Sequence, residues 1–278
     1  MNTAGPAVDP RRATVILVAL AASTFLFVTL ESLPAGLLTL MAPDLGRPTS
    51  QIGLLVTAYA LVVLVSSVPL AHVTRALPRR FVFLMVTTVL VVTGAFGVIT
   101  FVTQYLINVA GFSQADLPPL LLLQGGAGVV GALVVGRFLD RRPVGAFLVG
   151  VCVLVVALVG LWAFGGSPVG AVACLTLFGF AFSTVPPVLS HRVLLAAPRG
   201  TNMGQAVSSS LFNLGIAAGS GLGAVLVSVV DVRAVPLVSA AVVLLALLVA
   251  LAEERWCAPL DSVARKAVDE VVGEEIAA

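Results

Sequence analysis

Long apolar runs, separated by short polar links, dominate the pattern of this chain. Each run holds about 20 or more mostly apolar residues, enough for a helix to cross the hydrocarbon core of a bilayer. Because the runs are continuous, they predict helices rather than the alternating strands of a membrane barrel. The expected fold is an all-α integral membrane bundle with eight transmembrane helices. They cover residues 13–40, 52–74, 81–107, 117–136, 143–164, 168–190, 203–230 and 234–252.

The links between the runs predict their direction. With the N-terminus in the cytoplasm, 13 arginine and lysine residues fall on the inner side and only two, Arg47 and Arg233, fall outside. This distribution satisfies the positive-inside rule. An even number of spans places both ends inside, as a leader over 1–12 and a tail over 253–278. A cleaved signal peptide is the alternative for the first run, but the run is too long and carries Glu31.

Composition excludes most other protein classes. The 278 residues are 59% hydrophobic and 10% charged, with a mean hydropathy of +1.13. A soluble domain has about 25% charged residues, so disorder, a nucleic-acid interface and a secreted disulfide scaffold are excluded. The net charge of +2 implies no polyanionic partner. The three cysteines lie far apart without zinc or redox spacing, and we expect neither a metal nor a cofactor.

Glu31 is the ionisable residue that lies deepest within the eight runs. A carboxylate at this depth costs roughly 2.5–3.5 kcal/mol to insert, and such residues usually face a cavity and serve ion or proton movement. We therefore expect Glu31 to couple protons to transport. The alternative is that it lies near the outer interface and is simply hydrated. Pro34, three residues later, indicates a local break in the helix.

Neutral polar and small residues recur inside the later runs. Gln104, Asn108 and Asn213 are candidates for lining a substrate path. The alternative for each is an interhelical hydrogen bond, worth only about 0.6–2 kcal/mol. The glycines at 215, 219 and 223 repeat every four residues, which favours close approach of two helices.

Two arginine-rich cytoplasmic links are candidate gates, because charged clusters there can hold helix ends together in one state and release them in another. A plain positive-inside anchor is the alternative. The candidate gate residues are Arg75, Arg79 and Arg80 in one link and Gly136, Asp140 and Arg141 in the other.

These links resemble the major facilitator superfamily. Gly136-Arg-Phe-Leu-Asp140-Arg141 is similar to its cytoplasmic signature loop, and residues 70–80 resemble the matching loop, with Thr74 where many members have an aspartate. The stretch from Thr29 to Gly46 is similar to the first helix of bacterial drug and sugar efflux proteins of the drug:proton antiporter group.

The chain departs from that family in length. Members have about twelve helices in two six-helix halves. Residues 13–75 resemble the first two helices, and residues 76–252 resemble the six helices of the C-terminal half. Helices three to six therefore have no counterpart here, and the expected fold is a truncated major-facilitator-like bundle.

The resemblance implies proton-coupled efflux of a small organic molecule, of the drug or sugar type, across a bacterial inner membrane. The expected partners are the lipid bilayer, the substrate and protons, and a homo-oligomer would be one way to complete a shortened carrier. The alternative is an internally deleted remnant that inserts but does not transport alone. An intramembrane enzyme would need clustered polar groups, and His72 and His191 have no partner pattern, so we expect no enzyme.

Overall fold

The computed structural model describes residues 40–54, 79–139, 143–196 and 203–255, together with positions 14, 18, 29, 37, 57, 58 and 61. Within these residues the chain is helical, and six helices are long and apolar enough to cross a bilayer. The expected polytopic helical bundle is thus present for the six later runs. Most of the first two runs lies outside the described residues. So do four predicted site residues, Glu31, Arg75, Asp140 and Arg141.

Five long helices are followed by a sixth over residues 235–255, here called the last helix. Two short 3-10 helices, η1 (Gln114–Asp116) and η2 (Val232–Ala234), precede α4 and the last helix. Helices α5 and α6 each begin at a proline, which suits the first helical position because the amide hydrogen there needs no partner within the helix. The long helices are α3 (Arg79–Asn108), α4 (Leu117–Leu139), α5 (Pro143–Phe164), α6 (Pro168–Ala196) and α7 (Met203–Val229).

Several helices run past the ends that the apolar pattern predicts. Helix α6 continues from the expected residue 190 to Ala196, and the last helix continues from 252 to 255. Glu253 therefore lies in a helix and not in the expected tail. The reason is that apolar runs mark only the part of a helix that is matched to hydrocarbon, whereas backbone hydrogen bonding continues through the polar residues beyond it.

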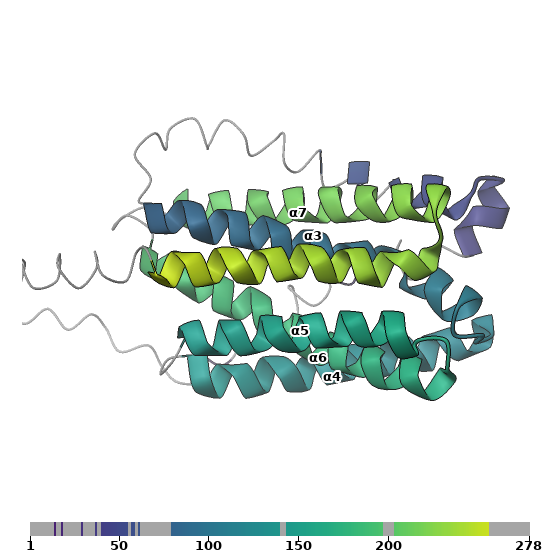
Figure 1. The fold of residues 1–278 in the computed structure, drawn as a ribbon, viewed down its shortest axis with the longest axis horizontal. Coiled ribbons are helices and arrows are strands. Elements are labelled where there is room, and N and C mark those ends of the chain that lie inside the picture. The colour runs from purple at the N-terminus through teal and green to yellow at the C-terminus, as the bar shows by residue number, and fades with distance from the viewer. Residues whose placement is uncertain are drawn as a thin grey trace, which may run out of the picture.

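The helices form two layers (Figure 1), with α3, α7 and the last helix in one and α4, α5 and α6 in the other. The most extensive helix–helix contacts join α3 to α7, α4 to α6 and α5 to α6. In chain order the six helices form two units of three, α3–α4–α5 and α6–α7–last helix. The first helix of the first unit, α3, packs on α7 of the second unit. The first helix of the second unit, α6, packs in return on α4 and α5. The two three-helix units exchange their first helices.

Glycines allow the backbones within the α3 layer to touch. A Cβ atom at Gly215 would clash with Val92 of α3, and one at Gly219 would clash with the carbonyl oxygen of Thr93. On the other side of α3, a Cβ at Gly94 would meet Val243 of the last helix. The predicted close approach of the glycine-bearing helix is confirmed, because these contacts exist only where the side chain is a hydrogen atom.

Aromatic rings join the two layers. Phe96 of α3 lies edge-on to Phe182 of α6 and to Phe212 of α7, with ring centroids 6.1 and 6.3 Å apart. Phe182 stacks in turn on Phe178, one helical turn earlier. Such pairs each contribute about 0.5–1.5 kcal/mol beyond the area that they bury. These rings therefore contribute to the packing of α6 on the α3 layer.

Candidate functional site

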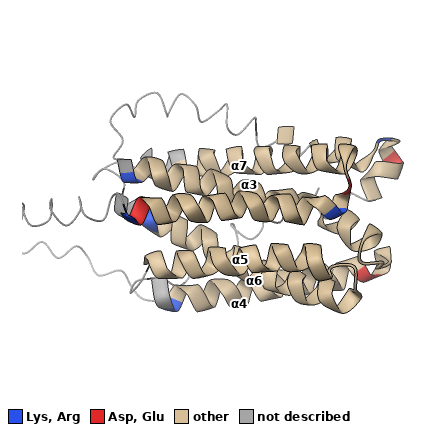
Figure 2. Ribbon diagram, in the orientation of Figure 1, with Lys and Arg blue, Asp and Glu red and all other residues tan. Residues whose placement is uncertain are grey.

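The described charges gather at the two ends of the bundle, with uncharged helices between them (Figure 2). We call the end where α3 begins the arginine end and the opposite end the aspartate end. The arginine end carries Arg80, Arg137, Arg192, Glu253, Glu254 and Arg255, at the start of α3 or near the ends of α4, α6 and the last helix. The aspartate end carries Asp44, Arg47, Asp116, Asp231 and Arg233, near the opposite ends of the helices.

A pocket of about 580 Å³, lined by both polar and apolar residues, opens at the aspartate end. Two of the predicted path residues, Gln104 and Asn108, line it from α3, where a spacing of four residues puts them on one face of the helix. Gln114 of η1 lines it as well, and Arg47 and Thr49 complete its polar wall. The side-chain oxygen of Gln104 is buried and has no hydrogen-bond partner among the described residues.

Arg47 reaches this pocket through a helix-ending turn. The amide of Gly46 donates to the carbonyl of Pro43, and that of Arg47 donates to the carbonyl of Ala42, each over 3.1 Å. Gly46 has a φ of +59°, the left-handed conformation that this Schellman turn requires after the last helical residue. Pro48 directly follows and begins the next helical turn, so Arg47 is held between two fixed backbone segments.

The segment that carries Arg47 is anchored to the bundle. Ile52 is 4% exposed, and Phe101 of α3 lies directly against Gly53. Further along, the hydroxyl of Thr57 donates to the backbone carbonyl of Ala217 in α7 over 3.4 Å. The pocket therefore lies between this segment and α3, and its two walls come from parts of the chain about 60 residues apart.

A second pocket of about 450 Å³ adjoins the first, and Asn108 lines both. Its other walls include Trp162 of α5, Asp231 and Arg233. Asp231 accepts a hydrogen bond from the backbone amide of Arg233 over 2.7 Å and caps η2.

Asn213 lies apart from the other predicted path residues. It lines neither of these pockets, and its side-chain amide donates to the carbonyl of Ser209 in the same helix over 3.0 Å. Its side-chain oxygen is buried without a described partner. The structure thus brings Gln104 and Asn108 together and leaves Asn213 elsewhere.

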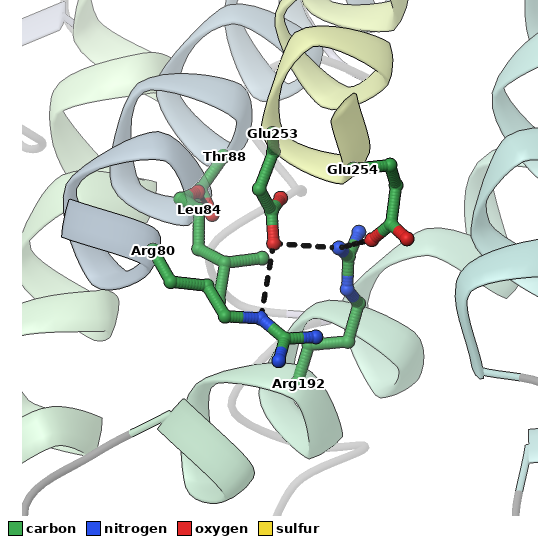
Figure 3. A network of polar contacts seen from close by, with 6 residues as sticks. All are labelled: Arg80, Leu84, Thr88, Arg192, Glu253 and Glu254. Atoms are coloured by element: carbon green, nitrogen blue, oxygen red, sulfur yellow. Dashed lines mark hydrogen bonds and ion pairs between the residues drawn. The ribbon is translucent and has the colours of Figure 1, made fainter. Parts of the chain in front are cut away.

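At the arginine end, a buried ion-pair network joins three helices (Figure 3). Nη2 of Arg192 in α6 lies 2.9 Å from Oε1 of Glu253 in the last helix, and the two side chains are 2% and 1% exposed. The same oxygen lies 3.3 Å from Nε of Arg80 in α3. Nη2 of Arg192 also lies 3.2 Å from Oε1 of Glu254. The network ties α3 and α6 to the end of the last helix.

The network is only partly satisfied. Its contacts converge on two atoms, Oε1 of Glu253 and Nη2 of Arg192. Oε2 of Glu253 and the Nε and Nη1 atoms of Arg192 are buried without a described partner. The guanidinium of Arg192 lies 5.3 Å from the ring centroid of Phe147, and this cation–π contact offsets part of the desolvation cost. A buried pair with unmet bonds contributes little net stability when intact, yet is costly to break on one side only.

The predicted gate residues that the structure describes lie at the arginine end, and only one of their described side chains contributes to the network. Arg80 is in the network. Gly136 is exposed near the end of α4, and a Cβ there would meet nothing within 4 Å. The neighbouring Arg137 donates to the carbonyl of Leu133. Arg79 begins α3, and its side chain lies outside the described part of the structure.

Arg192 and Glu253 are the two buried charged residues of the described chain, and the sequence did not single them out. Arg192 counted only as a charge in a cytoplasmic link, and Glu253 as the first residue of the tail. One signal could have found them: an acid directly after the last apolar run and an arginine directly after the sixth run are expected on the same side of the membrane.

No family model matches the chain. No group of three metal-binding side chains occurs among the residues described.

Proposed function

We propose that this chain is a membrane carrier that moves a small organic molecule across the bilayer in exchange for protons. The exchange of first helices between the units α3–α4–α5 and α6–α7–last helix carries this proposal. Three crossings reverse the direction of the chain, so the second unit runs opposite to the first. Inverted repeats of this kind are typical of secondary transporters, in which one repeat rocks against the other.

The two ends of the bundle support alternating access. Two pockets open at the aspartate end, whereas Arg192 and Glu253 are buried in ion pairs at the arginine end. A carrier open to one side requires that arrangement, with the ion-pair network as the closed gate. Substrate entry at the arginine end requires Glu253 to separate from Arg80 or Arg192.

The resemblance to the major facilitator superfamily is part of the same proposal. Six described helices in two exchanged units agree with the six-helix C-terminal half that the sequence resembles. The described charges at the arginine end include four arginines, against two at the aspartate end, which favours the arginine end as the cytoplasmic side of a bacterial inner membrane. Both termini would then be cytoplasmic, and transport would be export.

Proton coupling is assigned to Glu31 on the sequence argument. The test uses the full-length chain in liposomes with an imposed pH gradient and three probes: ethidium, glucose and gluconate. We expect at least one probe to move with the gradient and expect Glu31→Gln to abolish that movement, because an amide cannot carry the proton. Glu270→Gln in the predicted tail is the matched control. Unchanged transport in Glu31→Gln would rule out the assigned role, and no movement of any probe would contradict the proposed carrier.

A carrier that is complete only as two copies is the second candidate, and the exposure of α4 favours it. This helix is the least buried of the six, with Leu122 and Leu133 exposed by 77% and 63%. A Cβ at Gly125 or Gly126 would meet nothing within 4 Å. A second copy or lipid could cover this face. Counting single labelled chains per nanodisc distinguishes the two, because a pair that is lost with Gly126→Leu would support the two-copy carrier.

A further inference from the structure

An exposed cation, Arg47, lines the larger pocket at the aspartate end. Among the described residues, no carboxylate forms an ion pair with Arg47, and the other polar residues in the pocket wall are neutral. They are the amides of Gln104, Asn108 and Gln114 and the hydroxyl of Thr49. Arg47 is thus the charged side chain in this wall, and it favours a negatively charged group on a ligand that binds there.

None of the three aspartates near this pocket lines it, and two of them accept hydrogen bonds from other residues. Asp116 accepts hydrogen bonds from the amide and the hydroxyl of Ser113, over 2.9 and 2.7 Å, and caps η1. Asp231 caps η2 and lines only the neighbouring pocket. Asp44 lies in the helix before Arg47, is exposed and does not line the pocket. The backbone turn at Gly46 fixes the residue that carries the charge, so Arg47 does not depend on a carboxylate to position it.

The amides indicate the rest of the ligand. Three side-chain amides line this pocket, those of Gln104, Asn108 and Gln114. Side-chain amides both donate and accept, so three of them in one wall match a molecule with several hydroxyl groups. Asn108 connects this wall to the pocket lined by Trp162.

We propose that this pocket binds a small hydroxylated anion, with its carboxylate or phosphate on Arg47 and its hydroxyls on Gln104, Asn108 and Gln114. The inference rests on the proposed function, for which it names the substrate class. In this proposal, Arg47 makes the pocket select a negatively charged molecule over its neutral counterpart. An ion pair reinforced by hydrogen bonds to a guanidinium is stronger than a neutral hydrogen bond, so discrimination by charge should be large.

The experiment measures binding, which does not depend on transport. The chain has two tryptophans, so Trp256→Phe leaves Trp162 as the only reporter, one pocket away from the anion. Full-length protein in nanodiscs is titrated with two matched pairs: gluconate against glucose, and glycerol 3-phosphate against glycerol. We expect saturable fluorescence changes with at least one anion in the millimolar range and none with its neutral partner. Whether gluconate or glycerol 3-phosphate binds more tightly identifies the carboxylate or the phosphate as the anionic group.

Variants then test whether Arg47 provides the positive charge that binds the anion. Arg47→Gln should weaken anion binding by about tenfold or more, whereas Arg47→Lys should retain part of it. Arg137→Gln, which removes an exposed arginine at the opposite end, is the matched control and should leave binding unchanged. Retention of the wild-type elution volume by Arg47→Gln shows that the variant is folded. Equal binding of neutral and charged probes, no saturable change with any of the four, or wild-type anion affinity in Arg47→Gln would overturn the proposal.

Anion binding without pH-driven transport would refute the proposed carrier function but would still support the anion site. Transport of a neutral probe without anion binding would do the reverse.

Discussion

Arg192 and Glu253 form an ion pair of 2.9 Å between α6 and the last helix, and both side chains are almost completely buried. They are 61 residues apart in the chain. Each belongs to the second three-helix unit, but Glu253 also contacts Arg80 from the first. The pair therefore lies where the two units meet, and a change in its charge should affect how they are held together.

Removing only one member of this pair should destabilise the protein strongly. Glu253→Gln leaves the buried Arg192 guanidinium with only the partly exposed Glu254 as a counter-ion, and breaking a buried pair in this way costs about 3–5 kcal/mol. Thermal unfolding in nanodiscs measures the loss. The control is Glu254→Gln, whose side chain is 32% exposed and whose loss should cost about 1 kcal/mol or less. The double variant Arg192→Met with Glu253→Leu should recover most of the stability, because the two charges that lose a partner, on Arg80 and Glu254, are partly exposed. Equal unfolding temperatures for the two single variants would contradict the burial of the pair.

The contact between α3 and α7 should tolerate no side chain at its centre. In Gly219→Ala, the new methyl group clashes with the carbonyl oxygen of Thr93, and relieving such overpacking costs about 1–3 kcal/mol. Gly126→Ala in α4 is the matched control, because its Cβ has open space and alanine favours a helix by about 1 kcal/mol. We expect a lower unfolding temperature for the first variant and an equal or higher one for the second. The reverse order would show that these helices do not pack as described.

The turn at Gly46 should control the pocket through Arg47. A β-branched residue is strained at a φ of +59°, so Gly46→Val should move the chain and weaken anion binding by about tenfold. Gly46→Asn should remain close to wild type, because asparagine adopts the left-handed conformation with little cost. Titration of the Trp162 reporter measures both. If valine and asparagine at this position bind the anion equally, the turn does not position Arg47.

Gln104 and Asn213 should differ in their effect on transport. Gln104→Leu removes a polar group from the wall of the larger pocket and should lower uptake into liposomes about tenfold. Asn213 bonds to its own helix, so Asn213→Leu should change the rate by about twofold or less. Initial rates, compared at equal amounts of reconstituted protein, decide between them. A larger loss for Asn213→Leu would assign the path to α7 instead of the face of α3.

The sequence predicted the helices but not the pairing of their ends. Apolar run length determines where a helix can cross a bilayer, and for this reason the expected spans from 81 to 252 match the six described helices closely. Run length contains no information on partners. Arg192 and Glu253 come together only because the part of α6 that carries Arg192 meets the last helix in the folded chain.

The site was predictable to the same extent. Gln104 and Asn108 share a face because four residues make about one helical turn, which sequence alone provides. Arg47 could not be assigned to them, because its contribution to the pocket depends on how the segment over 40–54 packs against α3. Local periodicity thus predicted one wall of the pocket, and only tertiary contacts supply the other.

A carrier requires the arginine end to open, and a distance measurement tests this most directly. Spin labels replace the exposed Arg137 on α4 and Arg255 on the last helix, in a chain without its native cysteines, and pulsed electron paramagnetic resonance gives their separation. The labels lie in different layers and leave the network of Arg80, Arg192 and Glu253 intact. We predict one short distance for the wild-type network and a second, longer population when Glu253→Gln breaks it. A single unchanged distance in both proteins would contradict a gate at this end.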